Sequence, residues 1–399
     1  MRLLGKAVAI PTPSGPHAIG TARYEVSEGG YVDPYAPAPV PRRVPVQAWY
    51  PAQVTDGPGE PGLDEELRAA LSAMTRVPKF LLRPGRTAAI VNAPAVPGRY
   101  PVLIFNHGYG SFQKQSTSLL GELASHGYVV LSVGHPYESL AVRYADGTVI
   151  RWRSDLPAWA TVAAGLKELE QNLRAIAPLF ERARAARNAT TLRDVMSAIA
   201  AQPSYAALVP VLEVWTHDTR VVLDTLGHLD AGALAPPLRG LVDASRVGAF
   251  GHSLGGILAG QLAMTEARIR AAMNFDGAQL PPPHGPYALA APCCFVYADT
   301  LTVGQTSSAN EGVNDALTLA GPPGSCGACI VGAGHLNFTD MNNMAMMSKA
   351  LGPIDRGVMA RTLRAMTVGF FDHHLKGAPL AGFGPSPTLR VHWPSGAPA

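Results

Sequence analysis

A serine flanked by glycines follows a short apolar run in the segment RVGAFGHSLGGILAG, residues 246–260. Residues 251–255, GHSLG, match the pattern G-x-S-x-G, in which a strand turns sharply into a helix and exposes a nucleophilic serine. A glycine inside a helix costs roughly 1 kcal/mol relative to alanine, so these glycines indicate a crowded backbone. A dinucleotide-binding loop is the alternative, but it needs G-x-G-x-x-G spacing, which this segment lacks. The pattern predicts that Ser253 is a nucleophile for acyl transfer.

A serine nucleophile needs a histidine as base and a carboxylate that orients the histidine. In folds built around this turn, the acid follows the serine in the chain and the histidine follows the acid. His335 is the predicted base, because it comes directly after the apolar run CIVGA, residues 329–333. Asp276, after AAMNF, and Asp299, after CCFVYA, are both candidates for the acid. Position alone slightly favours Asp299, and both remain open at this point.

Acyl transfer also needs donors for the negative oxygen of the tetrahedral intermediate. One predicted donor is the backbone N–H of Leu254, directly after the serine. The other is the backbone N–H of Tyr109, in the strand-to-loop segment PVLIFNHGYGSF, residues 101–112. Glycines beside Tyr109 let the backbone turn its amides inward. We therefore expect an oxyanion hole formed by the amides of Tyr109 and Leu254.

The elements that must position these residues are buried strands separated by helices. Apolar runs of strand length occur at residues 101–106, 128–133, 247–250, 271–275, 293–298 and 329–333. Such continuous runs are typical of a parallel sheet that is covered on both faces. Residues 7–24 and 44–50 carry further β-rich segments, and Pro45 suggests an edge strand or a strand start. The predicted class is α/β: an α/β-hydrolase fold with a mostly parallel central sheet and helices on both faces.

One long helix-forming stretch interrupts the alternation of strands and helices. Residues 155–214 are expected to form a helical insertion, either a cap over the carboxyl edge of the sheet or a packing element. Residues 51–99 read as a surface excursion with a short helical patch at 65–74. An amphipathic helix is expected at 213–228, leading into the serine strand. The whole chain, residues 1–399, is predicted to be a single domain.

Composition and charge exclude several classes of function. The net charge of +3 is small for 399 residues and no dense basic run occurs, so no nucleic-acid partner is expected. No apolar stretch reaches about 18 residues, so no transmembrane segment is expected. The N-terminus lacks a sustained apolar region before Pro11. We expect a cytoplasmic protein if the chain is complete, and a secreted one if a signal peptide has been removed.

The four cysteines fall into two groups, Cys293–Cys294 and Cys326–Cys329, at the starts of two apolar runs. Adjacent residues of a strand point to opposite faces, which disfavours a zinc site. Buried free thiols, or one disulfide between neighbouring strands, are expected instead. No cofactor and no metal are predicted.

The sequence resembles the platelet-activating factor acetylhydrolase family of α/β-hydrolases, the monomeric, plasma-type branch with bacterial carboxylesterase relatives. The matching stretches follow the same order along most of the chain and are PTPSGPHAIGTARYEV, VQAWYPA, PVLIFNHGYGSF, LASHGYVVLSVGHPYES, GHSLGG, NFDG, GHLNFTD and FFDHHLKG. The resemblance implies a nucleophile at Ser253, a base at His335 and an acid at Asp276 rather than Asp299. It also implies oxyanion donors at Tyr109 and Leu254.

The expected function is hydrolysis of a carboxylic ester, with a small-molecule ester as the partner. Short to medium acyl groups are favoured, and the resemblance extends to enzymes that act on synthetic or plasticiser esters. The alternatives are a serine peptidase or amidase of the same fold, and an α/β-hydrolase-fold protein that binds without catalysis.

Overall fold

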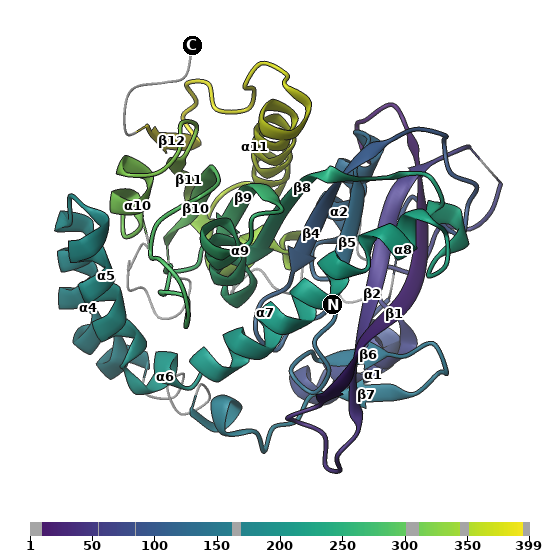
Figure 1. The fold of residues 1–399 in the computed structure, drawn as a ribbon, viewed down its shortest axis with the longest axis horizontal. Coiled ribbons are helices and arrows are strands. Elements are labelled where there is room, and N and C mark those ends of the chain that lie inside the picture. Colours follow the sequence, from purple (N-terminus) through teal and green to yellow (C-terminus); the bar gives the residue numbers. More distant parts are fainter. Residues whose placement is uncertain are drawn as a thin grey trace. The chain divides into compact units, whose positions relative to one another are not determined.

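The computed structural model describes residues 10–54, 56–83, 85–161, 169–300, 311–343 and 351–393 (Figure 1). These residues form two compact units, between which the chain passes several times. Unit 1 comprises the described residues within 1–152, 217–247 and 339–348. Unit 2 comprises those within 153–216, 248–338 and 349–399. The prediction of a single domain stays a prediction, and each unit is described by itself.

Unit 1 is built on strands in the order β3-β1-β2-β5-β4. Their bounds are β1 Ala18–Val32, β2 Pro41–Ala52, β3 Ala89–Val91, β4 Tyr100–Asn106 and β5 Val129–Val133. β4 and β5 are parallel, whereas β2 runs antiparallel to both β1 and β5. The strands predicted at 101–106 and 128–133 are confirmed. The β-rich segment expected at 7–24 differs, because β1 begins at Ala18 and continues to Val32.

The prediction that Pro45 marks an edge strand or a strand start was wrong. Pro45 lies inside β2, which has a neighbour on each side, and is opposite Glu25 of β1. The ladder to β5 begins one residue later, at Val46 opposite Val133. The carbonyl of Pro45 still accepts the N–H of Gly134 at 2.9 Å. A proline is tolerated here because its missing N–H falls just before the ladder to β5 starts.

Short helices and a hairpin complete unit 1. They are α1 Glu65–Thr75, η1 Lys79–Leu81, α2 Thr117–Ser125, the pair β6 Ala141–Arg143 and β7 Val149–Arg151, α8 Leu226–Asp230, η2 Pro236–Leu238 and η4 Asp340–Asn343. α2 packs against β2 and β5. The helix predicted at 213–228 starts earlier and is split into α7, Val209–Asp224, and α8. Thr225 separates the two with non-helical dihedral angles.

Within unit 1, a buried ion network connects β2 to the part of α7 that belongs to this unit, from His217 onward. The guanidinium of Arg42 makes two hydrogen bonds to Asp218, at 2.6 and 2.7 Å, and one to Asp33 at 3.1 Å. All three side chains are at most 2% exposed. Asp218 also accepts a hydrogen bond from Nδ1 of His135 at 2.8 Å. Burial opposes ionisation of Asp218, but the charge of Arg42 outweighs it and lowers the pKa of Asp218 to about 2.

Unit 2 is built on strands in the order β12-β11-β10-β9-β8. Their bounds are β8 Val242–His252, whose first residues belong to unit 1, β9 Ile269–Phe275, β10 Cys293–Thr300, β11 Cys326–Gly334 and β12 Leu389–His392. β9, β10 and β11 are parallel, and β12 is antiparallel to β11. Consecutive residues 293–298 are all at most 3% exposed, so both faces of β10 are covered. The four runs predicted as strands from residue 247 onward are confirmed.

The helices of unit 2 include most of the predicted insertion. They are α4 Leu169–Ala185, α5 Ala189–Ala200, α6 Pro203–Ala206, α9 Leu254–Thr265, α10 Asp315–Leu319, η3 His335–Phe338 and α11 Arg356–Lys376. α9 and α11 both pack against β9. α4 and α5 lie side by side (Figure 1) and pack against α10. The region 155–214 is therefore mostly helical where it is described, and its role as a cap stays a prediction. Of the helices described, none has the length and apolarity needed to cross a membrane.

Candidate active site

Ser253 occupies a sharp turn between β8 and α9. Its backbone has φ 56° and ψ −118°, a combination that a residue with a side chain rarely adopts. The N–H of Ser253 donates to the carbonyl of Phe275 at 2.8 Å, which ties the turn to the end of β9. The side chain of Ser253 is half-buried. A strained residue held by its neighbours between a strand and a helix is the geometry that G-x-S-x-G predicts.

The helix that follows the turn packs so closely against its neighbours that Gly256 has no room for a side chain. A Cβ added to Gly256 would lie 2.4 Å from Oδ1 of Asn274 and 3.0 Å from the carbonyl oxygen of Gly251. Residues 254–264 of α9 are all buried. α9 begins at Leu254, and the N–H groups of a first turn have no acceptor within their own helix. The N–H of Leu254 therefore belongs to a set of donors that suits a developing negative charge.

His335 and Asp276 form a close pair at the ends of β11 and β9. Nδ1 of His335 lies 2.6 Å from Oδ2 of Asp276. The carboxylate is 1% exposed, whereas the imidazole is 30% exposed. The other oxygen of Asp276 accepts the N–H of Ala298 at 3.0 Å. The carboxylate of Asp276 can only accept a hydrogen bond, so Nδ1 of His335 is the donor and carries a proton. Nε2 is then the ring nitrogen that can act as a base.

The second candidate for the acid is engaged elsewhere. Asp299 accepts hydrogen bonds from Nη2 of Arg390 at 2.8 Å and from the N–H of Gly332 at 2.9 Å. Of the two carboxylates, Asp276 is the one that contacts His335.

Asp276 is held in an unusual conformation by a buried asparagine. Its φ of 58° lies in the left-handed region, which side chains other than glycine enter at a cost. Oδ1 of Asn274 accepts the N–H of Gly277 at 2.8 Å, and its Nδ2 donates to the carbonyl of Gly277 at 3.0 Å. Nδ2 also donates to the side chain of Gln279 at 3.1 Å. These bonds hold the turn that presents Asp276 to His335.

His252, the residue before the serine, contacts the backbone of the base. Its Nε2 lies 2.9 Å from the carbonyl oxygen of His335, and the two rings are 4.4 Å apart between centroids. A carbonyl can only accept, so Nε2 of His252 carries the proton. Burial, together with the nearby His335, lowers the pKa of His252 to about 3. His252 is therefore a neutral donor that fixes the backbone of His335.

Tyr109 belongs to unit 1, in the loop after β4. The N–H of Gly110 donates to the carbonyl of Glu138 at 3.2 Å, and its φ of 72° favours glycine. A Cβ on Gly110 would lie 2.5 Å from the ring of Trp152. The N–H of Gly108 donates to Oε1 of Gln115 at 2.7 Å. The loop is thus fixed on both sides of Tyr109, whose part in an oxyanion hole stays a prediction.

One cluster among the described residues has the composition of a metal site. Asp299, Glu311 and Cys329 offer ligand atoms that all lie within 4.8 Å of one another. Nη2 of Arg390 donates to all three, at 2.8, 2.6 and 3.3 Å. The guanidinium already supplies the positive charge that a metal ion would bring to these groups. We interpret the cluster as an ion-pair network that joins β12 to β10 and β11.

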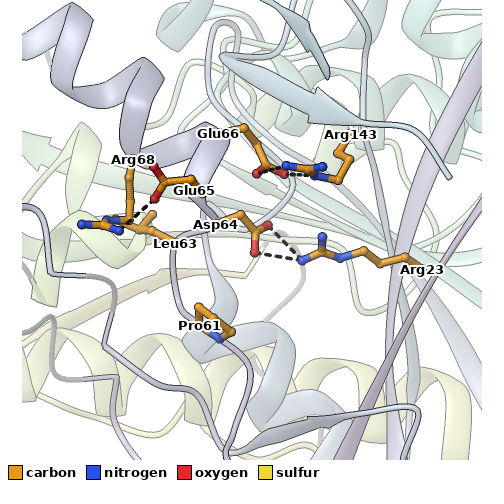
Figure 2. A pocket seen from close by; sticks show the side chains of 8 residues that line it. All are labelled: Arg23, Pro61, Leu63, Asp64, Glu65, Glu66, Arg68 and Arg143. Atoms are coloured by element: carbon orange, nitrogen blue, oxygen red, sulfur yellow. Dashed lines mark hydrogen bonds and ion pairs between the residues drawn. The ribbon is translucent and has the colours of Figure 1, made fainter. Parts of the chain in front are cut away.

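A pocket of about 310 Å³ lies in unit 1 (Figure 2). It is lined by ion pairs, which are Arg23 with Asp64, Arg143 with Glu66 and Arg68 with Glu65. Figure 2 shows the two side chains of each pair directed at one another. The lining residues do not include a predicted site residue, and the paired charges present no excess of either sign to a ligand. The pocket therefore gives no reason to move the candidate site from Ser253.

Comparison with known proteins agrees with this arrangement of elements. Residues 5–351 match the model of the family "Platelet-activating factor acetylhydrolase, isoform II". The chain belongs to that family. A platelet-activating factor acetylhydrolase from Cavia porcellus is 26% identical over 277 residues, and one from Gallus gallus is 25% identical over 280 residues. These alignments cover 67% and 69% of this chain but only 55% and 62% of the two relatives.

A solved structure confirms the fold. A ferulic acid esterase from Streptomyces cinnamoneus superposes with a TM-score of 0.67 at 23% identity, covering 97% of this chain and 99% of that one. The α/β-hydrolase fold predicted from the sequence is thereby confirmed for this member of the acetylhydrolase family. The span matched by the family model includes the serine turn and the Asp276–His335 pair.

Three residues near the candidate site were not singled out from the sequence. They are His252, Asn274 and Asn337. Oδ1 of Asn337 accepts the N–H groups of Gly334 and Gly352, both at 2.8 Å, and so holds the end of β11 before His335. All three stand in motifs that were recognised, which are GHSLGG, NFDG and GHLNFTD. For His252 and Asn274, a polar residue near the end of an apolar strand was the available signal, because burial obliges it to find hydrogen-bond partners. Asn337 lies in η3 and had no such signal.

Proposed function

We propose that this protein is a carboxylic ester hydrolase that works through an acyl-enzyme on Ser253. The observation that carries the proposal is the pair of His335 and Asp276, 2.6 Å apart, at the ends of two strands of the unit that also holds the strained serine turn. The contact between His335 and His252, the residue adjoining the serine, supports a base close to the nucleophile.

The reaction follows from the acid–base properties of these groups. Ser253 Oγ attacks the ester carbonyl while Nε2 of His335 takes its proton, and Asp276 stabilises the resulting imidazolium. His335 then protonates the departing alcohol, and water repeats the sequence on the acyl-enzyme. The N–H of Leu254, and that of Tyr109 as predicted from the sequence, would hold the oxyanion. The proposed reaction uses no metal and no cofactor.

Short to medium acyl esters are the proposed substrates. The relatives are named for release of an acetyl group and for esters of ferulic acid. An acetyl group is the shortest common acyl chain, and a ferulic ester places an aromatic group on the acyl side. Synthetic or plasticiser esters remain part of the same proposal. A serine peptidase or amidase is less well supported, since these names both describe ester hydrolysis.

The test is hydrolysis of p-nitrophenyl esters from acetate to palmitate, compared with the matching anilides. We expect activity that peaks at short or medium chains, little activity on anilides, and a loss of kcat on the order of 10⁴ or more in Ser253→Ala. A fluorophosphonate should label wild type and leave Ser253→Ala unlabelled. Wild-type protein that is inert towards every ester and towards the fluorophosphonate would favour a binding protein, and preferential cleavage of anilides would favour an amidase.

A further inference from the structure

Strand register in unit 2 brings two buried cysteines together. Cys294 of β10 is directly opposite Cys326 of the parallel strand β11. Their Sγ atoms are 2.8 Å apart, and both residues are 0% exposed. The two positions are separated by 32 residues of sequence, so the contact is a product of the fold.

The structure holds both residues as free thiols, and their separation is longer than the roughly 2.05 Å of a disulfide bond but shorter than two packed thiols adopt. Even two carbon atoms in contact stand about 3.5–4.0 Å apart, and sulfur is larger than carbon. Neighbouring strands are about 4.8 Å apart, which lies within the range of Cα separations that a disulfide spans. We propose that Cys294 and Cys326 form a disulfide that crosslinks β10 to β11.

The other two cysteines are placed differently. Cys293 adjoins Cys294 on the same strand, and adjacent residues of a strand point to opposite faces. Cys329 accepts a hydrogen bond from Nη2 of Arg390 at 3.3 Å, and its register partner on β10 is Tyr297. One crosslink and two thiols are therefore expected from the four cysteines.

The crosslink forms by exchange with a disulfide of another molecule, such as oxidised glutathione. One cysteine thiolate attacks that disulfide, releases one reagent thiol and forms a mixed disulfide. The second cysteine then attacks the mixed disulfide and releases the other reagent thiol. Two electrons and two protons leave the protein thiols, and two thiols of the reagent are released. Burial raises the pKa of Cys294 well above that of a free thiol, and thiolate is the attacking species. The exchange therefore occurs during folding, before the two strands are covered.

The crosslink lies at the start of the strand that ends before His335. It closes the segment between residues 294 and 326, and closing a loop restricts the unfolded chain more than the folded one. For a loop of this length in a chain of this size, we expect the thermal midpoint of the oxidised protein to exceed that of the reduced protein by about 4 °C. The bond does not involve a residue proposed for catalysis, so the proposal stands apart from the function.

The test is to refold the full chain in a glutathione redox buffer, denature it, alkylate the free thiols and measure intact and peptide masses. We expect alkylation of Cys293 and Cys329 only, with a crosslinked peptide that joins Cys294 to Cys326. The double variant C293S/C329S is the matched control and should keep the crosslink with no alkylated thiol. The variant C294S should show three alkylated thiols and lose the difference in thermal midpoint between oxidised and reduced samples.

Four alkylated thiols in wild type after oxidative refolding would overturn the proposal. A crosslink that joins any other pair would overturn it as well. The wild-type measurement decides the question even if C294S fails to fold.

Discussion

The imidazole of His252 is placed to hold the proposed base through its backbone. We predict that His252→Phe, which keeps a ring but removes the donor to the carbonyl of His335, lowers kcat by about 10- to 100-fold with little change in KM. The reason is that a displacement of the base by a fraction of an ångström to 1 Å weakens proton transfer without removing binding contacts. Steady-state kinetics on a p-nitrophenyl ester measure both constants.

Two further variants sharpen this prediction. His252→Gln retains an N–H donor and should recover part of the lost kcat. His284 is exposed, so His284→Phe is a matched control that should leave kcat unchanged. Equal activity of wild type and His252→Phe would show that the hydrogen bond to His335 does not position the base.

For single residues, the sequence indicated which side chains could do chemistry better than it indicated which side chains they contact. Ser253 and His335 stand in local patterns that can be read along the chain. The choice between Asp276 and Asp299 cannot be made in that way, because both follow apolar strands. Asp299 pairs with Arg390, which is 91 residues away, and no local pattern marks that partner.

The start of α9 and its contact with β9 are the elements on which the serine turn depends. We predict that Gly256→Ala destabilises the protein and reduces esterase activity, although alanine normally favours a helix by roughly 1 kcal/mol. The added Cβ would meet Oδ1 of Asn274 at 2.4 Å, and Asn274 holds the turn that carries Asp276. Urea midpoints and kcat of the variant provide the measurement.

Gly227 in α8 is the matched control for this substitution. A Cβ there meets nothing within 4 Å, so Gly227→Ala should be neutral or stabilising by up to about 1 kcal/mol. A Gly256→Ala variant that is as stable and as active as Gly227→Ala would contradict the predicted clash with Asn274.

The buried network between β2 and α7 predicts a large stability effect. Asp218→Asn leaves the charge of Arg42 without its principal partner, and loss of one member of a buried pair costs about 3–5 kcal/mol. The pair of Asp243 and Arg246 is more exposed, so Asp243→Asn should cost less than about 1 kcal/mol. Denaturant unfolding compares the two variants. Similar losses of unfolding free energy in the two variants would mean that burial does not make the Arg42–Asp218 pair more important for stability than an exposed pair.

Helices and strands were predicted correctly where apolar periodicity alone decided the assignment. They were predicted poorly where a second signal, such as a proline, pointed to a different structure. Continuous apolar runs gave correct strands at β4, β5 and β9 to β11, because a strand covered on both faces must be apolar throughout. Pro45 suggested an edge strand, yet β2 has a neighbouring strand on each side. Its missing N–H is tolerated because the ladder to β5 begins only at the next residue, Val46. That register is set by pairing with distant strands, which a local sequence does not display.

In unit 2, the edge strand β12 is held by ion pairs of His392, whose charge depends on pH. His392 contacts Asp315 and Glu311, each at 3.1 Å, and these carboxylates raise the pKa of His392 to about 10 from its usual 6.5. A raised pKa means that the stabilisation is complete below about pH 6.5 and is lost as the pH rises through about 10. Stability of the whole molecule should therefore depend on His392 mainly at neutral and acidic pH.

We predict that His392→Gln lowers the urea midpoint at pH 6 and that its difference from wild type shrinks towards zero above about pH 10. His392 lowers the pKa of Glu311 to about 2, so that carboxylate titrates far below this pH range and the difference between the two proteins reports on His392. A difference that stays constant or grows between these pH values would contradict the assigned ion pairs.

The assignment of the acid gives the most direct test of the proposed hydrolase. The measurement is kcat for p-nitrophenyl acetate in wild type, Asp276→Asn and Asp299→Asn, with circular dichroism to show that each variant is folded. The account predicts a loss of about 10⁴-fold in Asp276→Asn, because the orientation and tautomer of His335 are no longer fixed, and near wild-type activity in Asp299→Asn. An active Asp276→Asn beside an inactive Asp299→Asn would contradict it.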